Sequence, residues 1–285
     1  MRFGFHVSIA GGLKNVMTRA HQRRCETIQL FSRNPRGWKC RPLDEEDIAI
    51  FKKELAGHEI WPVFVHLPYL INLATPQKTL FRKSLNALTL DLERCAAIGA
   101  PFLIMHVGSC PDVASGLERI SKGITRAFSK VKNNVMILLE NTAGSGNELG
   151  HTFEQLKTVI DRVEPSERTG VALDTAHAFA AGYDLRTKKA VARTFADFDR
   201  VIGLKRLHLL HLNDSKYERG SHKDRHWHIA KGKIGSGMYH ILHCPLLKDL
   251  PFIMETPRTN LKEDIMNMKK VRLLLDRRRQ TSSFK

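Results

Sequence analysis

Short apolar stretches recur along the chain, and a longer amphipathic stretch separates each one from the next. Eight of them have the Val, Ile, Leu and Phe enrichment of buried strands: residues 3–6, 27–31, 63–66, 102–106, 136–140, 171–174, 207–211 and 252–255. Successive stretches end 25 to 44 residues apart, which is enough for one strand and one helix. This alternation predicts parallel strands covered by helices.

The segments between the strands have helical features. Residues 44–58 open with acidic side chains in the first turn, and residues 77–98 have helical apolar spacing and stop at Gly99. No Pro-rich or Ser-rich linker divides the chain, so we predict a single domain over residues 1–285. Eight such units predict an α/β fold, a (β/α)₈ TIM barrel with its active site at the C-terminal ends of the strands. An open doubly wound sheet is the alternative, and we expect the basic residues 277–285 to form a frayed tail.

The charge balance points to a polyanionic partner. The chain has 46 Lys and Arg residues against 29 Asp and Glu residues, a formal net charge of +17. Such an excess favours nucleic acid, although an anionic membrane surface or solubility alone would also account for it.

Composition excludes several other classes of protein. Apolar residues make up 42% of the chain, too many for a disordered protein, and the apolar runs are far shorter than the roughly 20 residues of a membrane helix. The first residues lack the apolar core of a secretory signal. We therefore expect a cytoplasmic monomer that does not enter the membrane. The five cysteines are odd in number and form no CxxC pair, which argues against a disulfide framework or a cysteine zinc site.

Six consecutive strand candidates, the third to the eighth, end in a side chain that can bind a metal ion. These residues are His66, His106, Glu140, Asp174, His211 and Glu255. In a barrel the C-terminal strand ends meet on one face, so we expect the six side chains to surround one cavity. Imidazole and carboxylate ligands without thiolate suit Zn²⁺ or Mn²⁺, and a carboxylate that bridges two ions makes a multinuclear centre plausible.

Two further short motifs follow these strands. His177 comes three residues after Asp174, and Asp224 and His226 flank an arginine. Each motif alone is weak evidence, because isolated Asp and His residues at such spacings usually lie on the solvated surface.

At this point the sequence resembles the endonuclease IV family of apurinic/apyrimidinic (AP) endonucleases over nearly its whole length. The resemblance rests on residues 6–12 (HVSIAGG), 69–72 (YLIN), 140–144 (ENTAG), 174–184 (DTAHAFAAGYD), 211–216 (HLNDSK) and 224–226 (DRH). It implies three zinc ions, with Mn²⁺ possible at one or more positions. The ligands implied are His66, His106 and Glu140 for the first ion, Glu140, Asp174, His211 and Glu255 for the second, and His177, Asp224 and His226 for the third.

The resemblance also implies an activity, namely hydrolysis of duplex DNA on the 5′ side of an abasic nucleotide. The products are a 3′-hydroxyl and a 5′-deoxyribose phosphate, as base excision repair requires. Hydroxide between the first two ions would attack the phosphorus, and the third ion would stabilise the leaving oxygen. Glu140 and Glu255 are the catalytic candidates, the latter as a group that could also orient the attacking hydroxide.

Family resemblance assigns DNA contacts to Arg36, Tyr69 and Leu70, whose side chains could fill the gap left by a missing base. Packing against the barrel rim is the alternative for Tyr69 and Leu70, and it is as plausible as DNA contact for Trp38. For His6, Asn141, Asn213 and Lys216, hydrogen bonding to ligands, phosphate contact and a structural role all stay open.

The chain departs from the family pattern after the DRH motif. Relatives commonly have a Gly-Glu-Gly turn where this chain has Ala230, Lys231 and Gly232, followed by Lys233. The two lysines add positive charge, so DNA affinity could rise while the preference for the lesion relaxes. Ala176 stands where Cys is common, and a small side chain beside ligands should be tolerated.

Two other functions remain open from the sequence. A metal-dependent sugar isomerase or epimerase would use the same residue types at the strand ends, but it needs neither the +17 charge nor a third ion. A basic nucleic-acid-binding protein would hold its metal only as a structural element.

Overall fold

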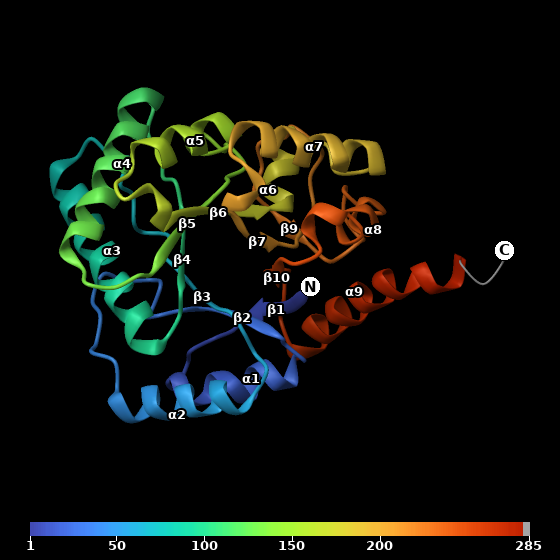
Figure 1. Ribbon diagram of the computed structural model, residues 1–285, viewed down its shortest axis with the longest axis horizontal. Coiled ribbons are helices and arrows are strands. Elements are labelled where there is room, and N and C mark those ends of the chain that lie inside the picture. The colour runs from blue at the N-terminus through green and yellow to red at the C-terminus, as the bar shows by residue number, and fades with distance from the viewer. Residues whose placement is uncertain (282–285) are drawn as a thin grey trace.

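A computed structural model describes residues 1–281 of the chain, with the side chains of residues 1–276. Eight parallel strands form a closed barrel, and the helices pack around it (Figure 1). The barrel strands are β1 (Arg2–His6), β2 (Thr27–Phe31), β3 (Val63–His66), β4 (Phe102–His106), β5 (Met136–Glu140), β6 (Thr169–Asp174), β7 (Leu207–His211) and β10 (Pro251–Met254).

Closure of the sheet decides between the two predicted architectures. Strand β1 pairs with β2 on one side and with β10 on the other, both in parallel. The (β/α)₈ barrel is therefore confirmed, and an open doubly wound sheet is excluded. A two-stranded antiparallel sheet of β8 (Asp214–Ser215) and β9 (His226–Trp227) lies outside the barrel.

The helices begin and end where local signals place them. Asp44 caps the helix predicted at residues 44–58 by accepting a hydrogen bond from the Asp47 amide, and Gly99 ends the helix predicted at 77–98 with a positive φ of 81°. The α-helices are α1 (Val16–Gln22), α2 (Glu45–Gly57), α3 (Lys78–Ile98), α4 (Val113–Lys130), α5 (Phe153–Arg162), α6 (Thr175–Ala180), α7 (Lys188–Val201), α8 (Gly237–Leu242) and α9 (Leu261–Thr281). Four short 3₁₀ turns in the described chain are Leu13–Asn15, Ser166–Arg168, Leu204–Arg206 and Pro245–Leu247.

The inside of the barrel is a small apolar layer, separate from the larger core between strands and helices. It consists of Phe64, Ile104, Leu138, Ala172, Leu209 and Ile253, one from each of six strands and all fully buried. Side chains two residues apart in a strand point to the same face. Every member of this layer therefore directs the residue two positions later toward the C-terminal mouth of the barrel.

Helix α9 packs against the rest of the molecule through the buried residues Met268, Val271 and Leu274, and its C-terminal end projects outward (Figure 1). It runs through Thr281, and so includes the first part of the segment predicted as a frayed tail. Residues 282–285 of that segment lie outside the described residues. The frayed tail therefore stays a prediction.

Candidate metal centre

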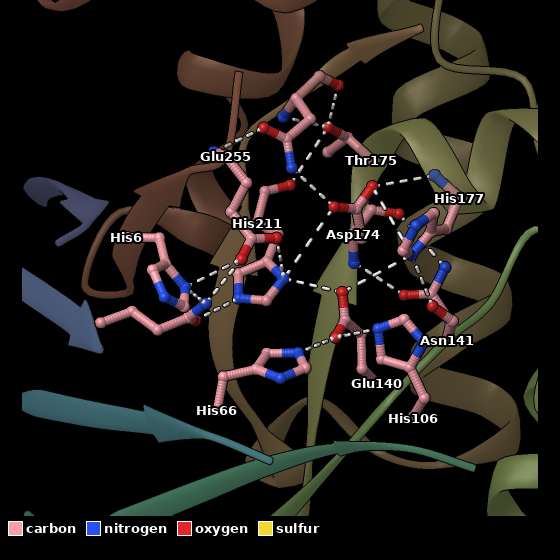
Figure 2. Close-up of polar contacts among 12 residues, drawn as sticks. His6, His66, His106, Glu140, Asn141, Asp174, Thr175, His177, His211 and Glu255 are labelled. Atoms are coloured by element: carbon pink, nitrogen blue, oxygen red, sulfur yellow. Dashed lines mark hydrogen bonds and ion pairs between the residues drawn. The ribbon is translucent and has the colours of Figure 1, made fainter. Parts of the chain in front are cut away.

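The side chains two positions beyond the barrel layer are the six strand-end candidates. They are His66, His106, Glu140, Asp174, His211 and Glu255, and they gather at the mouth of the barrel together with His177 (Figure 2). Together with His226, these residues form three groups whose ligand atoms lie within 4.8 Å of one another. Their members are His66, His106 and Glu140; Glu140, Asp174, His211 and Glu255; and Asp174, His177 and His226. The centre can therefore bind metal ions.

The first group converges on a single carboxylate oxygen. The Nε2 atoms of His66 and His106 lie 3.0 and 3.1 Å from Glu140 Oε2. The His66 ring is fixed from its other side, because Nδ1 lies 2.7 Å from the Leu67 carbonyl oxygen. Two imidazoles and one carboxylate oxygen thus surround one position.

The second group uses the other oxygen of the same carboxylate. His211 Nδ1 lies 2.8 Å from Glu140 Oε1 and 3.5 Å from Glu255 Oε2. Its distance from Asp174 Oδ2 is 3.9 Å. Glu140 is fully buried, and its two oxygens face two different groups of donors, as a bridging ligand requires (Figure 2).

The third group lies at the more open side of the mouth. His177 Nε2 is 3.2 Å from Asp224 Oδ1, and His226 Nε2 is 3.7 Å from the same oxygen. Asp174 is a member of this group as well as of the second, and its Oδ2 lies 3.3 Å from His226 Nε2. The sequence prediction assigned Asp174 to the second ion alone, whereas the structure places it between the second and third groups.

Burial and opposite charges act against each other at this centre. Burial raises the pKa of Glu140, but the imidazoles of His211 and His106 more than offset this and hold the pKa well below its usual range. Burial lowers the pKa of His211, yet the Glu140 and Glu255 carboxylates raise it to about 9. Burial also lowers the pKa of His177, but Asp174 and Asp224 hold it well above its usual value. The carboxylates and the imidazoles of His106, His177 and His211 therefore favour each other's charged forms.

Two asparagines hold the ligand-bearing strand ends in place. Asn141 exchanges two hydrogen bonds with the Asp174 backbone, at 2.6 and 3.1 Å. Asn213 donates to Asp174 Oδ2 at 2.7 Å and accepts from the Glu255 amide at 2.8 Å. Of the roles left open for them, hydrogen bonding to ligands is the one that the geometry favours.

His6 and Lys216 are placed differently from the two asparagines. His6 Nδ1 lies 3.4 Å from Glu255 Oε1, next to the second group. The Lys216 amine lies over the Trp227 ring, 4.9 Å from its centroid. Lys216 directly follows β8 and Trp227 is in β9, so this contact lies beside the small two-stranded sheet.

Three polar residues that sequence analysis missed also support the centre. Gln29 on β2 contacts His211, Glu255 and His6, and Asn267 on α9 bonds to Thr256 Oγ1 and the Ile229 amide. Asp214 accepts hydrogen bonds from the amides of the turn after β9. A polar residue in the middle of an apolar strand was the available signal for Gln29. Nothing in the sequence marks Asn267, because its partners lie 11 and 38 residues away.

The candidate DNA-contact residues lie on two loops at the same end of the barrel. Arg36 follows β2, while Tyr69 and Leu70 follow β3 and are 70% and 39% exposed. The Tyr69 ring lies 6.0 and 6.1 Å from the rings of His66 and His106. Beside this tyrosine is a 280 Å³ cavity that His106 and Asp224 also line.

The turn that holds Ala230, Lys231 and Gly232 has a left-handed residue at its start. Ala230 has a φ of +57°, in the left-handed region. Lys233 forms an ion pair with Glu218 at 2.6 Å, which neutralises part of the expected extra charge. Ala176 is buried in α6 next to His177, and its small side chain fits there.

Comparisons with known proteins agree with this fold. Residues 18–273 match the family described as xylose isomerase-like TIM barrels. A protein of Methanosphaerula palustris named a probable endonuclease 4 is 45% identical over 280 residues, covering 96% of this chain and 98% of that protein.

Solved structures show the same likeness. The crystal structure of endonuclease IV from Thermus thermophilus has a TM-score of 0.88 at 35% identity, covering 97% of this chain and 100% of that one. A D-tagatose 3-epimerase-like protein has a TM-score of 0.75 at 18% identity over 99% of this chain and 100% of its own, a likeness of fold alone. Within residues 1–281, no helix has the length and apolar character needed to cross a membrane.

Proposed function

The chain belongs to the endonuclease IV family, so it is a DNA repair endonuclease, and we propose that it cuts duplex DNA on the 5′ side of an abasic nucleotide through three metal ions. The products would be a 3′-hydroxyl and a 5′-deoxyribose phosphate. The observation that carries the proposal is the junction at Glu140, where one buried carboxylate joins two groups of donors at the mouth of the barrel.

The donors fit zinc-class ions. All are imidazole nitrogens or carboxylate oxygens, which suits Zn²⁺ or Mn²⁺. We assign His66, His106 and Glu140 to one ion and Glu140, Asp174, His211 and Glu255 to the second. The third would be held by His177, Asp224 and His226, with Asp174 Oδ2 close enough to assist.

Divalent ions held by these residues supply Lewis acidity that activates water and offsets the charge of the phosphate. Glu140 holds the two buried groups at a fixed spacing, because both of its oxygens are engaged. Glu255 is 17% exposed at its side chain, so it is positioned to orient the attacking water. His226 and Asp224 are at the open side, where the 3′ oxygen would leave.

Lesion recognition would use the exposed loops and the cavity between them. A missing base leaves a gap in the stack, and planar or apolar side chains can enter it. Arg36, Tyr69 and Leu70 lie at the rim and can make that contact. The 280 Å³ cavity lined by Tyr69, His106 and Asp224 has room for a flipped-out sugar next to the metal ligands.

The proposal is tested by incubating the purified holoprotein with a duplex that contains one abasic site, with the intact duplex as control. We expect a nick 5′ to the lesion whose 3′ end a polymerase can extend. Elemental analysis should find about three zinc-class ions per chain, and Glu140→Gln should lose more than one of them, because a neutral amide bridges cations poorly. A native metal content of one ion would contradict the trinuclear centre, and an intact abasic duplex would contradict the activity.

The third site has a separate test. His226→Ala should slow cleavage far more than it weakens DNA binding, since its role is in the transition state. Cleavage by His226→Ala at the normal rate would remove the assignment of the third group. Turnover of a ketose or aldose without cleavage of abasic DNA would instead favour the sugar isomerase alternative.

A further inference from the structure

Gln29 is a fully buried residue in the middle of β2, and its side-chain amide makes three contacts at the second group of donors. Its Nε2 donates to Glu255 Oε1 at 2.6 Å and lies 2.9 Å from His6 Nδ1. Its Oε1 lies 2.7 Å from His211 Nε2. One amide thus links two predicted ligands that come from different strands.

The two ends of this amide cannot exchange places. An ionised carboxylate only accepts hydrogen bonds, so the amide nitrogen must face Glu255. The amide oxygen then faces His211 and accepts from it, which requires a hydrogen on Nε2 of that ring. The opposite orientation would place two oxygens against each other at Glu255.

Gln29 contacts only one of the two potential ligand atoms in each of these side chains, and the other atom of each faces the metal centre. Gln29 occupies Nε2 of His211 and Oε1 of Glu255, while His211 Nδ1 faces Glu140 Oε1 at 2.8 Å and Glu255 Oε2 at 3.5 Å. We propose that Gln29 is a positioning residue that selects His211 Nδ1 and Glu255 Oε2 as ligand atoms by engaging the other atom of each side chain. This inference rests on the proposed metal centre and assigns a residue outside its nine ligands.

The barrel itself holds Gln29 in this place. Strand β2 lies between β1 and β3, with Gln29 in register with His6 on one side and Phe64 on the other. The side chain is enclosed, so the amide cannot turn out to water in exchange for its three contacts. Partners that hold metal ligands in this way typically contribute about 10–100-fold to metal affinity.

Two substitutions separate the contact with Glu255 from the contact with His211. Gln29→Met keeps the length of the side chain but removes both hydrogen bonds. Gln29→Glu keeps an acceptor for His211 but puts a carboxylate oxygen beside Glu255 Oε1, where only a donor fits. Thr27→Val is the matched control, because Thr27 is equally buried on the same strand and bonds to the Pro62 carbonyl oxygen, away from the centre.

The experiment measures zinc dissociation by competition with a chelator and the ring tautomer of His211 by ¹⁵N NMR of the zinc-loaded protein. Gln29→Met should lower the zinc affinity of one of the three positions about 10–100-fold. The His211 ring should then no longer be confined to the tautomer with its hydrogen on Nε2. Gln29→Glu should weaken the same ion while His211 keeps its Nε2–H form. Thr27→Val should bind zinc as the wild type does, whatever it does to the melting temperature.

The possible failures are distinguishable. Wild-type zinc affinity together with an unchanged His211 tautomer in Gln29→Met would overturn the positioning role. If Gln29→Met does not fold, wild-type zinc affinity in the isosteric Gln29→Glu overturns it instead. A wild-type protein that binds fewer than three ions, or that leaves abasic DNA intact, contradicts the proposed function and not the role of Gln29.

Discussion

Ala230 occupies a backbone conformation that usually belongs to glycine. Its φ of +57° places it in the left-handed region, where the Cβ of an L-residue crowds the following carbonyl oxygen. The turn is held from outside, because the Asp214 carboxylate accepts hydrogen bonds from the amides of Gly232, Ile234 and Gly235. These hydrogen bonds hold the turn, and with it Ala230, in this strained conformation.

Ala230→Gly should relieve this strain. The left-handed backbone conformation destabilises an alanine by about 1–2 kcal/mol. The greater conformational entropy of glycine in the unfolded chain offsets part of the stability gained by removing that strain. We expect a net stabilisation of about 1 kcal/mol, measured as a higher urea midpoint with an unchanged slope. Ala192→Gly, on the exposed face of α7, is the matched control and should destabilise by about 1 kcal/mol. A loss of stability in both variants would mean that the turn is not strained.

At the residue scale we also expect His211 to release a proton when a metal ion binds. In the metal-free protein the Glu140 and Glu255 carboxylates overcome the effect of burial and raise the pKa of His211 to about 9, so this imidazole is protonated at pH 7. A ring nitrogen must lose its proton to bind an ion. Zinc uptake at pH 7 should therefore release protons, and zinc affinity should rise with pH until it levels off above about 9.

Calorimetry checks this expectation directly. The apparent enthalpy of zinc binding should differ between two buffers of different ionisation enthalpy, by an amount that gives the number of protons released. Equal enthalpies in both buffers would show that the ligands are already unprotonated.

At the scale of elements, the apolar pattern predicted the strands and most of the centre for one physical reason. The barrel layer and the ligands are two residues apart on six strands, so burial of Phe64 or Leu138 also directs His66 or Glu140 into the mouth. Gln29 was missed because it lies in the middle of its strand and not at the end, where the other ligand-contacting residues are expected. Asn267 was missed because its contacts depend on how α9 packs, which local pattern does not encode.

A buried ion pair anchors the loop that carries Arg36. Asp91 on α3 pairs with Arg33 at 3.0 Å and accepts a hydrogen bond from Ser32. Arg33 and Arg94 in turn donate to the carbonyl oxygens of Gly37 and Arg41 at 3.2 and 3.0 Å. Helix α3 therefore holds both ends of the loop after β2.

Asp91→Ala should destabilise the protein by about 3–5 kcal/mol, because it leaves the buried Arg33 charge without its partner. Denaturant unfolding measures this loss. Asp161→Ala serves as control, since it removes the exposed Lys157–Asp161 pair on α5 and should change stability by less than about 1 kcal/mol. Equal effects in the two variants would show that the Asp91 pair contributes no more than a surface pair.

At the scale of the whole molecule, the net charge contributes affinity for any DNA, whereas the shape of the barrel rim contributes the preference for damaged DNA. The net charge of +17 provides attraction to any duplex, and the logarithm of that affinity falls with the logarithm of salt by about 0.9 per neutralised phosphate. This attraction is the same for damaged and intact DNA. Discrimination must come from the rim, where the exposed Tyr69 stands over His66 and His106.

Tyr69→Ala should accordingly weaken binding to abasic duplex while binding to intact duplex and its salt slope stay nearly unchanged. Insertion into intact DNA is opposed by unstacking, which costs roughly a few kcal/mol per step, whereas an abasic gap has already lost part of that stacking. The quantity to measure is the ratio of the two affinities at fixed ionic strength.

Trp61→Ala is the control, because Trp61 is also an exposed aromatic residue but precedes β3, at the opposite end of the barrel. Equal losses on both duplexes would make Tyr69 a packing residue of the rim, and an unchanged ratio in the double variant Arg36→Ala, Tyr69→Ala would remove insertion as the basis of lesion recognition.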